Sequence, residues 1–308
     1  MRILVTGGAG FQGSHLVELW LNSGHEITIL NTHSQRALNN LKPFGNQVQV
    51  VWGSVTDAEV VEKTVRDHEV VVHLAARVNV DDSIGAPRSF LDVNVTGTWN
   101  VLEAVRTSES RLIYGSSCEV YGSAEPLPVS ERSELKPHSP YAASKAAADR
   151  LCFAYNATHD IDITIVRPCN IYGERQKSGS GGAVIPIFVE RALACTPLTI
   201  FGDGSQQREY MNIDDLVKAY DLVLSRSDLA GETINFGSGE TISVKQIAEF
   251  VIAQLGGTIK YGPARRGELP GFQLESAFAQ GLGFTSAVGF WDGVSRFIEW
   301  RRMTPVAH

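Results

Sequence analysis

The stretch that decides the fold is Thr6-Gly7-Gly8-Ala9-Gly10-Phe11-Gln12-Gly13, close to the start of the chain. It follows an apolar strand candidate at 3–6 and opens a helix candidate at 11–23. Glycines at positions 7, 10 and 13 allow a tight turn in which backbone N–H groups and the helix N-terminus approach a pyrophosphate. The alternative is a purely structural glycine turn. Its place at the first strand-to-helix junction favours a nucleotide cofactor.

The first half of the chain alternates strand-like and helix-like segments. Short apolar runs separated by helices are typical of a parallel sheet that is covered on both faces. The strand candidates are 3–6, 26–30, 48–52, 70–74, 111–115 and 162–167. The helix candidates are 11–23, 57–66, 87–107 and 140–159. We therefore predict an α/β fold with a doubly wound parallel sheet.

The second half is less regular. It contains a glycine-rich stretch at 178–182, helix candidates near 183–194, 212–224, 243–255 and 289–301, and a strand candidate at 233–236. We predict that residues 1–168 form a dinucleotide-binding domain and residues 169–308 mainly a smaller, mixed α/β substrate-binding domain. The strand near 232–237 is expected to return to the first domain.

Composition excludes some classes of partner. The 308 residues are 43% hydrophobic and 20% charged, as in an ordinary globular chain of one or two domains. The net charge of −7 argues against non-specific nucleic-acid binding. No apolar run reaches membrane-spanning length, and the first strand leaves no room for a signal peptide. The dispersed Cys118, Cys152, Cys169 and Cys195 favour a reduced, cytoplasmic chain without a structural metal.

Two groups of residues have the character of a catalytic site. Ser117, Cys118 and Glu119 follow the strand candidate 111–115, and ligands bind beyond the carboxyl ends of parallel strands. Tyr141 and Lys145 are four residues apart and therefore project from one helix face. An ammonium lowers the pKa of a nearby phenol, so this pair can remove a hydroxyl proton near neutral pH. Glu119 adds a second, separately placed base.

Each of these residues also has an ordinary structural interpretation. Tyr141 could be a half-buried helix aromatic beside a solvated Lys145, and Glu119 a surface carboxylate. A free cysteine usually behaves as a small buried hydrophobe. The carboxylate next to Cys118 opposes thiolate formation, which favours proton donation over nucleophilic attack, and a direct role stays open. The glycine turn together with both groups favours catalysis.

Polar residues at the strand ends bear on the choice of ligand. Asn31 stands where an acidic residue would bind the adenosine ribose diol. Its amide can bond a ribose hydroxyl, which keeps NAD as the preferred cofactor. It does not repel a 2′-phosphate, and Arg36 lies close in sequence, so NADP stays the alternative cofactor, and a plain turn residue is the alternative interpretation of Asn31. Arg208 and either Arg265 or Arg266 are candidates for a substrate diphosphate, although each alone is an ordinary surface arginine.

In these residues the chain resembles the NAD-dependent epimerase/dehydratase family, the extended short-chain dehydrogenases that act on nucleotide sugars. The likeness runs almost from end to end. The shared motifs are 6–13, His73-Leu74-Ala75-Ala76, Asn94 with Gly97-Thr98, 116–122, 141–145, 167–173, 200–204 leading to Arg208, and 265–268. The resemblance implies a Rossmann fold with a smaller C-terminal substrate domain, and a homodimer formed through the helices 87–107 and 140–159.

The resemblance also implies roles for single residues. Tyr141 would take the proton of the sugar 4-hydroxyl, Lys145 would tune it and hold the nicotinamide ribose, and Ser117 would hydrogen-bond that hydroxyl. Cofactor contacts are implied at Gly7, Gly10, Phe11, Gln12, Gly13, Asn31, Ser54, Val55, Leu74, Ala75, Ala76, Tyr141, Lys145 and Pro168. Nucleotide-sugar contacts are implied at Ser83, Asn170, Ile200, Phe201, Arg208, Arg265 and Glu268.

Within the family, the pair after the catalytic Ser or Thr sorts the chemistry. The 4,6-dehydratases place Glu where Glu119 stands, often behind Asp and sometimes behind Ser, and sugar-nucleotide decarboxylases show Thr-Ser-Glu. Simple 4-epimerases usually carry small or non-acidic residues there. Cys118 replaces the Asp or Ser and is the main departure. Others are Asn31 for the ribose-binding acid, Ser54 for an adenine-contacting Asp, and Glu174 for a frequent Pro.

The Ser117-Cys118-Glu119 triplet most resembles the UDP-N-acetylglucosamine 5,6-dehydratase type of tunicamycin pathways. We expect oxidation at sugar C4, removal of the C5 hydrogen by Glu119, and loss of the C6 hydroxyl with a proton from Cys118. Hydride return to C4 gives a 5,6-ene, and return to C6 gives the 4-keto-6-deoxy sugar of a 4,6-dehydratase. Alternatives are a 4-epimerase, a UDP-glucuronate decarboxylase, and a non-enzymatic nucleotide-sensing module, against which the intact Ser117, Tyr141 and Lys145 argue.

Overall fold

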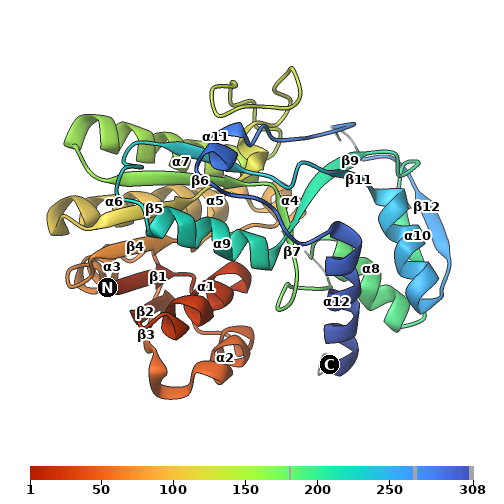
Figure 1. Cartoon of the computed structure of the whole chain (residues 1–308), viewed down its shortest axis with the longest axis horizontal. Coiled ribbons are helices and arrows are strands. Elements are labelled where there is room, and N and C mark those ends of the chain that lie inside the picture. Colours follow the sequence, from red (N-terminus) through yellow and green to blue (C-terminus); the bar gives the residue numbers. More distant parts are fainter. Residues whose placement is uncertain (180–181, 266–268, 305–308) are drawn as a thin grey trace.

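The strands of the first half lie side by side in one parallel sheet (Figure 1). The computed structural model describes residues 1–179, 182–265 and 269–304. The main sheet has the order β10-β6-β5-β4-β1-β2-β3, and all its pairs are parallel. Its strands are β1 (Arg2–Thr6), β2 (Glu26–Asn31), β3 (Gln49–Trp52), β4 (Val70–His73), β5 (Arg111–Gly115), β6 (Ile163–Pro168) and β10 (Thr233–Phe236). This order confirms the predicted doubly wound α/β class.

Helices cover both faces of this sheet, as the apolar strands require. They are α1 (Phe11–Asn22) and α9 (Ile213–Leu224) on one face, and α3 (Ala58–Val65), α6 (Gly97–Ser108) and α7 (Pro140–His159) on the other. Successive side chains of a strand point to opposite faces. Ile3 and Val5 accordingly belong to the hydrophobic cluster that includes α1 and α9, whereas Leu4 belongs to the cluster that includes α3, α6 and α7. All three are fully buried, so β1 is apolar throughout.

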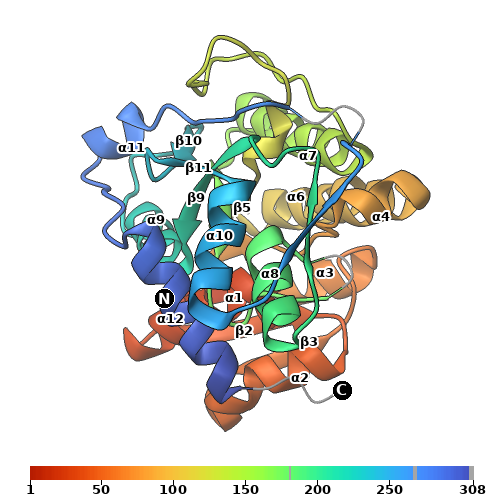
Figure 2. The same ribbon diagram turned by 90° about the vertical axis from the view of Figure 1, so that its right-hand side faces the viewer.

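The second half forms a smaller group of elements with its own hydrophobic cluster. Its strands are β7 (Asn170–Tyr172), β9 (Gln207–Asn212) and β11 (Thr241–Ser243) in one sheet, and β8 (Leu198–Phe201) and β12 (Ile259–Gly262) in another. Figure 2 shows α8 (Val184–Leu193), α10 (Val244–Leu255) and α12 (Phe290–Met303) grouped on this side. β10 and α9 come from the second half of the sequence but lie in and on the main sheet. In the described part of the chain, no helix has both the length and the apolar character needed to span a bilayer.

The long helix predicted over 87–107 is confirmed: the chain is helical from Pro87 to Ser108, with a π-helical segment inside the helix. It consists of α5 (Pro87–Phe90), a π-helical segment (Leu91–Thr96) and α6. Within the π-helical segment the buried Asn94 side chain accepts a hydrogen bond from the Arg77 amide at 2.8 Å and donates to the Arg77 carbonyl at 2.9 Å. It also donates to the Ser144 hydroxyl at 2.8 Å. The π-helical segment therefore holds the Asn94 side chain in the interior, where it links the loop after β4 to α7.

Several short elements were not predicted. They are α2 (Gln35–Leu41), α4 (Val80–Gly85), α11 (Ala277–Gly281) and the strands β7, β8, β9, β11 and β12. Each is too short to show an apolar period, and the strands alternate or mix polar residues because their sheets are covered on one side by the hydrophobic cluster of the second half. Of these elements, β7, β8 and β9 contribute residues to the lining of the cavity described below.

Candidate active site

A cavity of about 1660 Å³ extends from the β1–α1 turn to β8 and β9. Its position beyond the carboxyl ends of the parallel strands is the usual ligand position in such sheets. Of the predicted cofactor contacts, the cavity lining includes Gly7, Gly10, Phe11, Gln12, Gly13, Asn31, Ser54, Val55, Leu74, Ala75, Ala76, Tyr141, Lys145 and Pro168. It also includes Ser117, Cys118, Glu119, Asn170, Phe201, Arg208 and Arg265. The predicted cofactor contacts and the predicted catalytic and substrate contacts, which are far apart in the sequence, therefore line the same cavity.

Two predicted substrate contacts lie away from this lining. Ser83 is fully buried in α4, and its hydroxyl donates to the Val80 carbonyl at 2.6 Å. Ile200 is fully buried in the hydrophobic cluster of the second half, because the alternation of β8 turns it inward while Phe201 faces the cavity. Glu268 lies outside the described residues. A direct substrate contact from Ser83 or Ile200 therefore has no geometric support.

The glycine turn has the close packing that a pyrophosphate site requires. Gly7 has a φ of +73°, and its N–H donates to the Leu30 carbonyl at 2.9 Å. A Cβ added at Gly13 would lie 2.4 Å from the Gly7 carbonyl oxygen. Gly10 is the N-cap residue of α1 and has no side chain that could cap the helix. The first turn of α1 contains no acidic residue. Its first N–H groups are thus directed at the cavity without a competing side chain, and a dinucleotide pyrophosphate fits the cradle.

The adenosine end of the cavity is polar and lacks a carboxylate on β2. Asn31 accepts a hydrogen bond from the Ala9 amide at 3.3 Å and donates to the Thr32 carbonyl at 2.8 Å. The Ser54 hydroxyl lies 2.8 Å from that of Thr56. The Asn31 side chain is therefore held by the glycine turn on one side and by its own loop on the other, and its carboxamide takes the place of the usual ribose-binding acid.

Local capping places the phenol and the amine. Ser139 is the N-cap of α7, its hydroxyl accepts from the Ala142 amide at 3.0 Å, and Pro140 occupies the first turn. Tyr141 consequently stands in the first turn, at the cavity, and Lys145 lies one turn further on the same face. Both side chains are buried.

The protonation of this pair differs from the sequence expectation. Burial raises the pKa of Tyr141 well above its ordinary value, opposed by a hydrogen bond with Ser117. The Lys145 ammonium donates a hydrogen bond to the Gly115 carbonyl and lies 4.4 Å from the centre of the Tyr114 ring. Burial lowers the pKa of Lys145 itself to about 8. The Tyr141 side chain is therefore a neutral phenol in the free protein.

The thiol and the carboxyl group of the triplet lie in a low-dielectric part of the cavity. Burial raises the pKa of Glu119, and the charge of Arg208 lowers it. Burial raises the pKa of the Cys118 thiol well above its ordinary value, and the charge of Glu119 adds to this. The side chain of Cys118 is 3% exposed, so it is a protonated thiol. Ser117 caps this short turn by accepting a hydrogen bond from the Glu119 amide at 3.2 Å.

The opposite wall carries the candidate diphosphate ligands. Asn170 on β7 donates to the Glu209 carbonyl at 3.0 Å, and Arg208 on β9 donates to the Leu269 carbonyl at 2.9 Å. The guanidinium of Arg265 lies 4.6 Å from the centre of the Phe201 ring. It also pairs with Asp81 at 3.6 Å. These cations come from segments far apart in the sequence and face one space.

Sequence reasoning missed several residues of the lining. From the main-sheet side these are Asn79, Asp81 and His138, and from the second half they are Gln176, Glu190, Arg191, Gln206, Tyr210 and Phe272. Most stand in loops or on short elements without an apolar period, so no pattern marked them. Asn94 was marked in the sequence by the family motif that it forms with Gly97 and Thr98. In the structure its side chain holds the loop after β4 through two hydrogen bonds to the Arg77 backbone. Within the described ranges, no group of three or more His, Cys, Asp or Glu side chains could hold a metal ion.

The parallel sheet, the glycine turn and the Tyr141/Lys145 pair at one cavity define an α/β protein of the short-chain dehydrogenase class. Within that class, the chain belongs to the NAD-dependent epimerase/dehydratase family, whose model matches residues 3–237.

Relatives with two different activities are similar over nearly the whole chain. A dTDP-glucose 4,6-dehydratase of Streptomyces niveus is 35% identical over 317 residues, covering 98% of this chain and 93% of the relative. A UDP-glucose 4-epimerase of Mycolicibacterium smegmatis is 33% identical over 310 residues, covering 98% of this chain and 99% of the relative. The crystal structure of the dTDP-glucose 4,6-dehydratase DesIV from Streptomyces venezuelae, with NAD bound, is 33% identical with a TM-score of 0.92, covering 99% and 98%. Overall similarity thus supports a nucleotide-sugar enzyme without choosing its reaction.

Proposed function

We propose that the chain is a NAD-dependent nucleotide-sugar dehydratase, and that its substrate is UDP-N-acetylglucosamine, converted to the 5,6-ene sugar. The observation that carries the dehydratase proposal is the partly buried Glu119 carboxyl group beside the buried Cys118 thiol, in the same cavity as Tyr141. A 4-epimerase oxidises C4 and returns the hydride to the same carbon, so it needs only the base for the C4 hydroxyl, which is Tyr141. An added base and an added proton donor are what the loss of water across C5–C6 requires.

The cofactor is NAD. The glycine cradle and the free N-terminus of α1 accommodate the pyrophosphate, and Asn31 offers its amide to a ribose hydroxyl. Lys145 lies beside Tyr141, where its ammonium can hold the nicotinamide ribose. When bound, NAD accepts a hydride from the sugar and returns it, and its positive ring favours ionisation of a nearby phenol.

The residues of the chain have separate proton-transfer roles. The Tyr141 phenolate oxygen takes the proton of the C4 hydroxyl, which Ser117 holds by a hydrogen bond, as this carbon is oxidised. The resulting ketone acidifies the C5 hydrogen, and the Glu119 carboxylate takes that proton. The Cys118 thiol gives its proton to the departing C6 hydroxyl, which leaves as water.

The proton balance then closes inside the cavity. Glu119 is left protonated and Cys118 is left as a thiolate, in an environment that strongly disfavours the thiolate. As C4 is reduced again, the Tyr141 phenol gives its proton back to the C4 oxygen, and transfer of the proton from Glu119 to Cys118 restores the other two groups. Cys118 is buried and Glu119 is partly buried, which limits the supply of these protons by bulk water.

Glu119→Gln tests the proposal. The variant keeps the shape of the side chain but has no base for the C5 proton. A dehydratase should still oxidise C4 and stall there, with water loss reduced about 100-fold or more. A 4-epimerase would continue to turn over. The control is Glu134→Gln, which removes a carboxylate that is 77% exposed.

The substrate and the product need separate measurements. Purified protein should be incubated with UDP-, dTDP- and GDP-sugars, and the products examined by mass for loss of water and by NMR for C5 exchange in D₂O. A surviving vinyl signal selects the 5,6-ene, and a 4-keto-6-deoxy product selects the 4,6-dehydratase, which the named dehydratase relative favours. Release of CO₂ from a uronic acid would select a decarboxylase instead. Cofactor binding without turnover on any sugar would overturn the enzyme proposal.

The proposal includes a homodimer formed through α6 and α7. Trp99 on α6 is 48% exposed and Phe153 on α7 is 50% exposed, which is high for large apolar side chains. Light scattering of the purified protein should give twice the mass of one chain, and Phe153→Arg should give one chain mass. We also propose a cytoplasmic location, which the four free cysteines support.

A further inference from the structure

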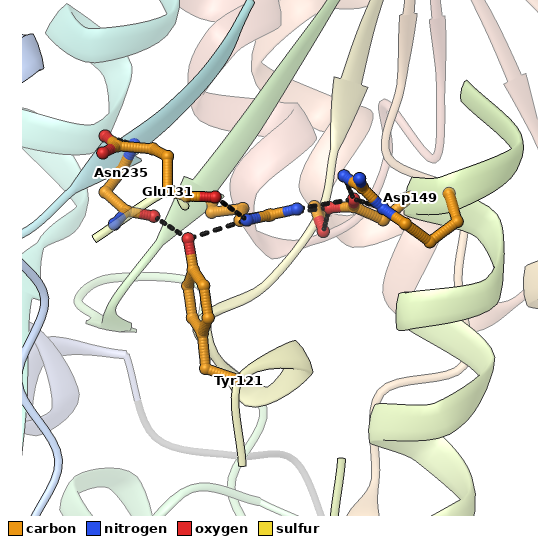
Figure 3. Close-up of polar contacts among 7 residues, drawn as sticks. Tyr121, Glu131, Asp149 and Asn235 are labelled. Atoms are coloured by element: carbon orange, nitrogen blue, oxygen red, sulfur yellow. Dashed lines mark hydrogen bonds and ion pairs between the residues drawn. The ribbon is translucent and has the colours of Figure 1, made fainter. Parts of the chain in front are cut away.

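A buried polar network lies next to the cavity (Figure 3), and Ser116 is its member in the cavity lining. Its centre is the ion pair of Arg167 on β6 with Asp149 on α7, joined by two hydrogen bonds of 2.7 and 2.9 Å. Arg167 is 1% exposed and Asp149 is fully buried. The charge of Arg167 keeps the pKa of Asp149 below its ordinary value, although burial acts in the opposite direction. A buried pair of this kind is not strong evidence for stability, so its reason must be sought in what it holds.

One arm of the network holds the start of the catalytic segment. The Ser116 hydroxyl donates to the Asp149 carboxylate at 2.6 Å. Ser116 immediately precedes the Ser117-Cys118-Glu119 triplet. Asp149 stands one turn after Lys145 and two turns after Tyr141 on α7. The same carboxylate therefore contacts both the helix that carries the phenol and the residue that immediately precedes the triplet.

A second arm holds the end of the same segment. Arg167 donates to the Tyr121 hydroxyl at 2.7 Å, and that hydroxyl donates to the Asn235 side chain at 2.7 Å. Tyr121 is fully buried and follows Glu119 by two residues. Its single hydroxyl thus accepts one bond and donates another, and no solvent replaces either partner. The backbone N–H of Asn235 in turn donates to the Glu131 carboxylate at 2.9 Å, which holds Asn235 in place.

We propose that the Arg167–Asp149 pair, acting through Ser116 and Tyr121, is a positioning device that sets Cys118 and Glu119 against Tyr141. The segment 116–121 is held at both ends by one ion pair, and α7 is held by the same ion pair. Elimination requires the C5 base and the C4 base to meet one sugar ring, so the two must keep a fixed relation. The kinetic part of this inference rests on the proposed dehydratase function.

Tyr121→Phe tests the second arm, because it removes the hydroxyl and keeps the ring. We expect water loss and C5 exchange to fall about 10-fold while oxidation at C4 and the KM of the nucleotide sugar stay within about twofold. Ser116→Ala tests the first arm and should give a similar loss. The matched control is Tyr220→Phe, since Tyr220 is a fully buried tyrosine whose hydroxyl has no hydrogen-bond partner among the described residues.

Backbone hydrogen exchange gives a readout that does not depend on the reaction. Both test variants should increase amide exchange in a peptide covering 116–122, and Tyr220→Phe should not. If the test variants lower only the melting temperature, with exchange and the ratio of elimination to oxidation as in the control, the positioning role is wrong. If the unaltered protein eliminates no water from any nucleotide sugar, the proposed function fails, and the exchange comparison still decides the positioning role.

Discussion

The cofactor end of the cavity is built mainly from backbone groups, whereas the reacting end is built from side chains. The cofactor end consists mainly of backbone, from glycines 7, 10 and 13 and the N-terminus of α1. The side-chain amide of Asn31, at the end of β2, completes it. The reacting end consists of side chains, the triplet 117–119 with Tyr141 and Lys145, whose protonation is set by burial. A backbone cradle serves any reaction that uses a dinucleotide. The reaction itself must therefore be decided at the side-chain end, and substitutions at the two ends should have different kinetic signatures.

The largest effect is expected at the reacting end. Tyr141→Phe removes the base for the C4 hydroxyl, so kcat should fall about 1,000-fold or more, whereas the dissociation constant of NAD should change by less than about twofold. Steady-state turnover and a titration with NAD measure the two quantities. The matched substitution Tyr220→Phe should leave both unchanged. A variant that loses cofactor binding as strongly as turnover would break the distinction between the two ends.

The next effect is expected at the cofactor end. In Gly13→Ala the added Cβ would lie 2.4 Å from the Gly7 carbonyl oxygen, so the turn must shift. Overpacking of this kind costs about 1–3 kcal/mol, which corresponds to roughly 5- to 150-fold weaker NAD binding. At saturating NAD, kcat should recover. Calorimetric titration checks the affinity, and Gly281→Ala is the control because its Cβ would meet nothing within 4 Å. Unchanged affinity would contradict a pyrophosphate site at this turn.

The smallest effect concerns pH. Only the ionised Glu119 takes a proton, and burial raises its pKa while the Arg208 charge lowers it. In Arg208→Gln the pKa rises further, so less carboxylate is present at a given acid pH. The acid limb of kcat at saturating nucleotide sugar should therefore move to higher pH. Arg191→Gln, which removes another cavity arginine, should not move it. A shift toward lower pH would show that a different group controls the limb.

The sequence predicted the cofactor end well, because spacing alone defines it. Glycines at a strand-to-helix junction and apolar runs separated by helices are readable without contacts, and the α/β class follows from them. The triplet and the Tyr/Lys pair were also found, because strand ends converge at one edge of a parallel sheet.

The remaining features depend on how the chain packs. The neutral state of Tyr141 follows from burial, which no local pattern encodes. The π-helical segment carries Asn94, whose side chain bonds the Arg77 backbone 17 residues earlier. Ser83 was assigned by resemblance and is instead fully buried in α4, where its hydroxyl bonds the Val80 carbonyl. Such burial and contacts leave no period in the sequence.

The Arg265–Asp81 pair has a consequence for how the cavity handles charge. Arg265 faces the cavity with its guanidinium already matched by a carboxylate and stacked on Phe201. If the proposed function holds, a substrate diphosphate at Arg265 must compete with the Asp81 carboxylate for the same guanidinium. Both side chains are more than half exposed, so water screens their pairing and exchanging one anion for another costs little.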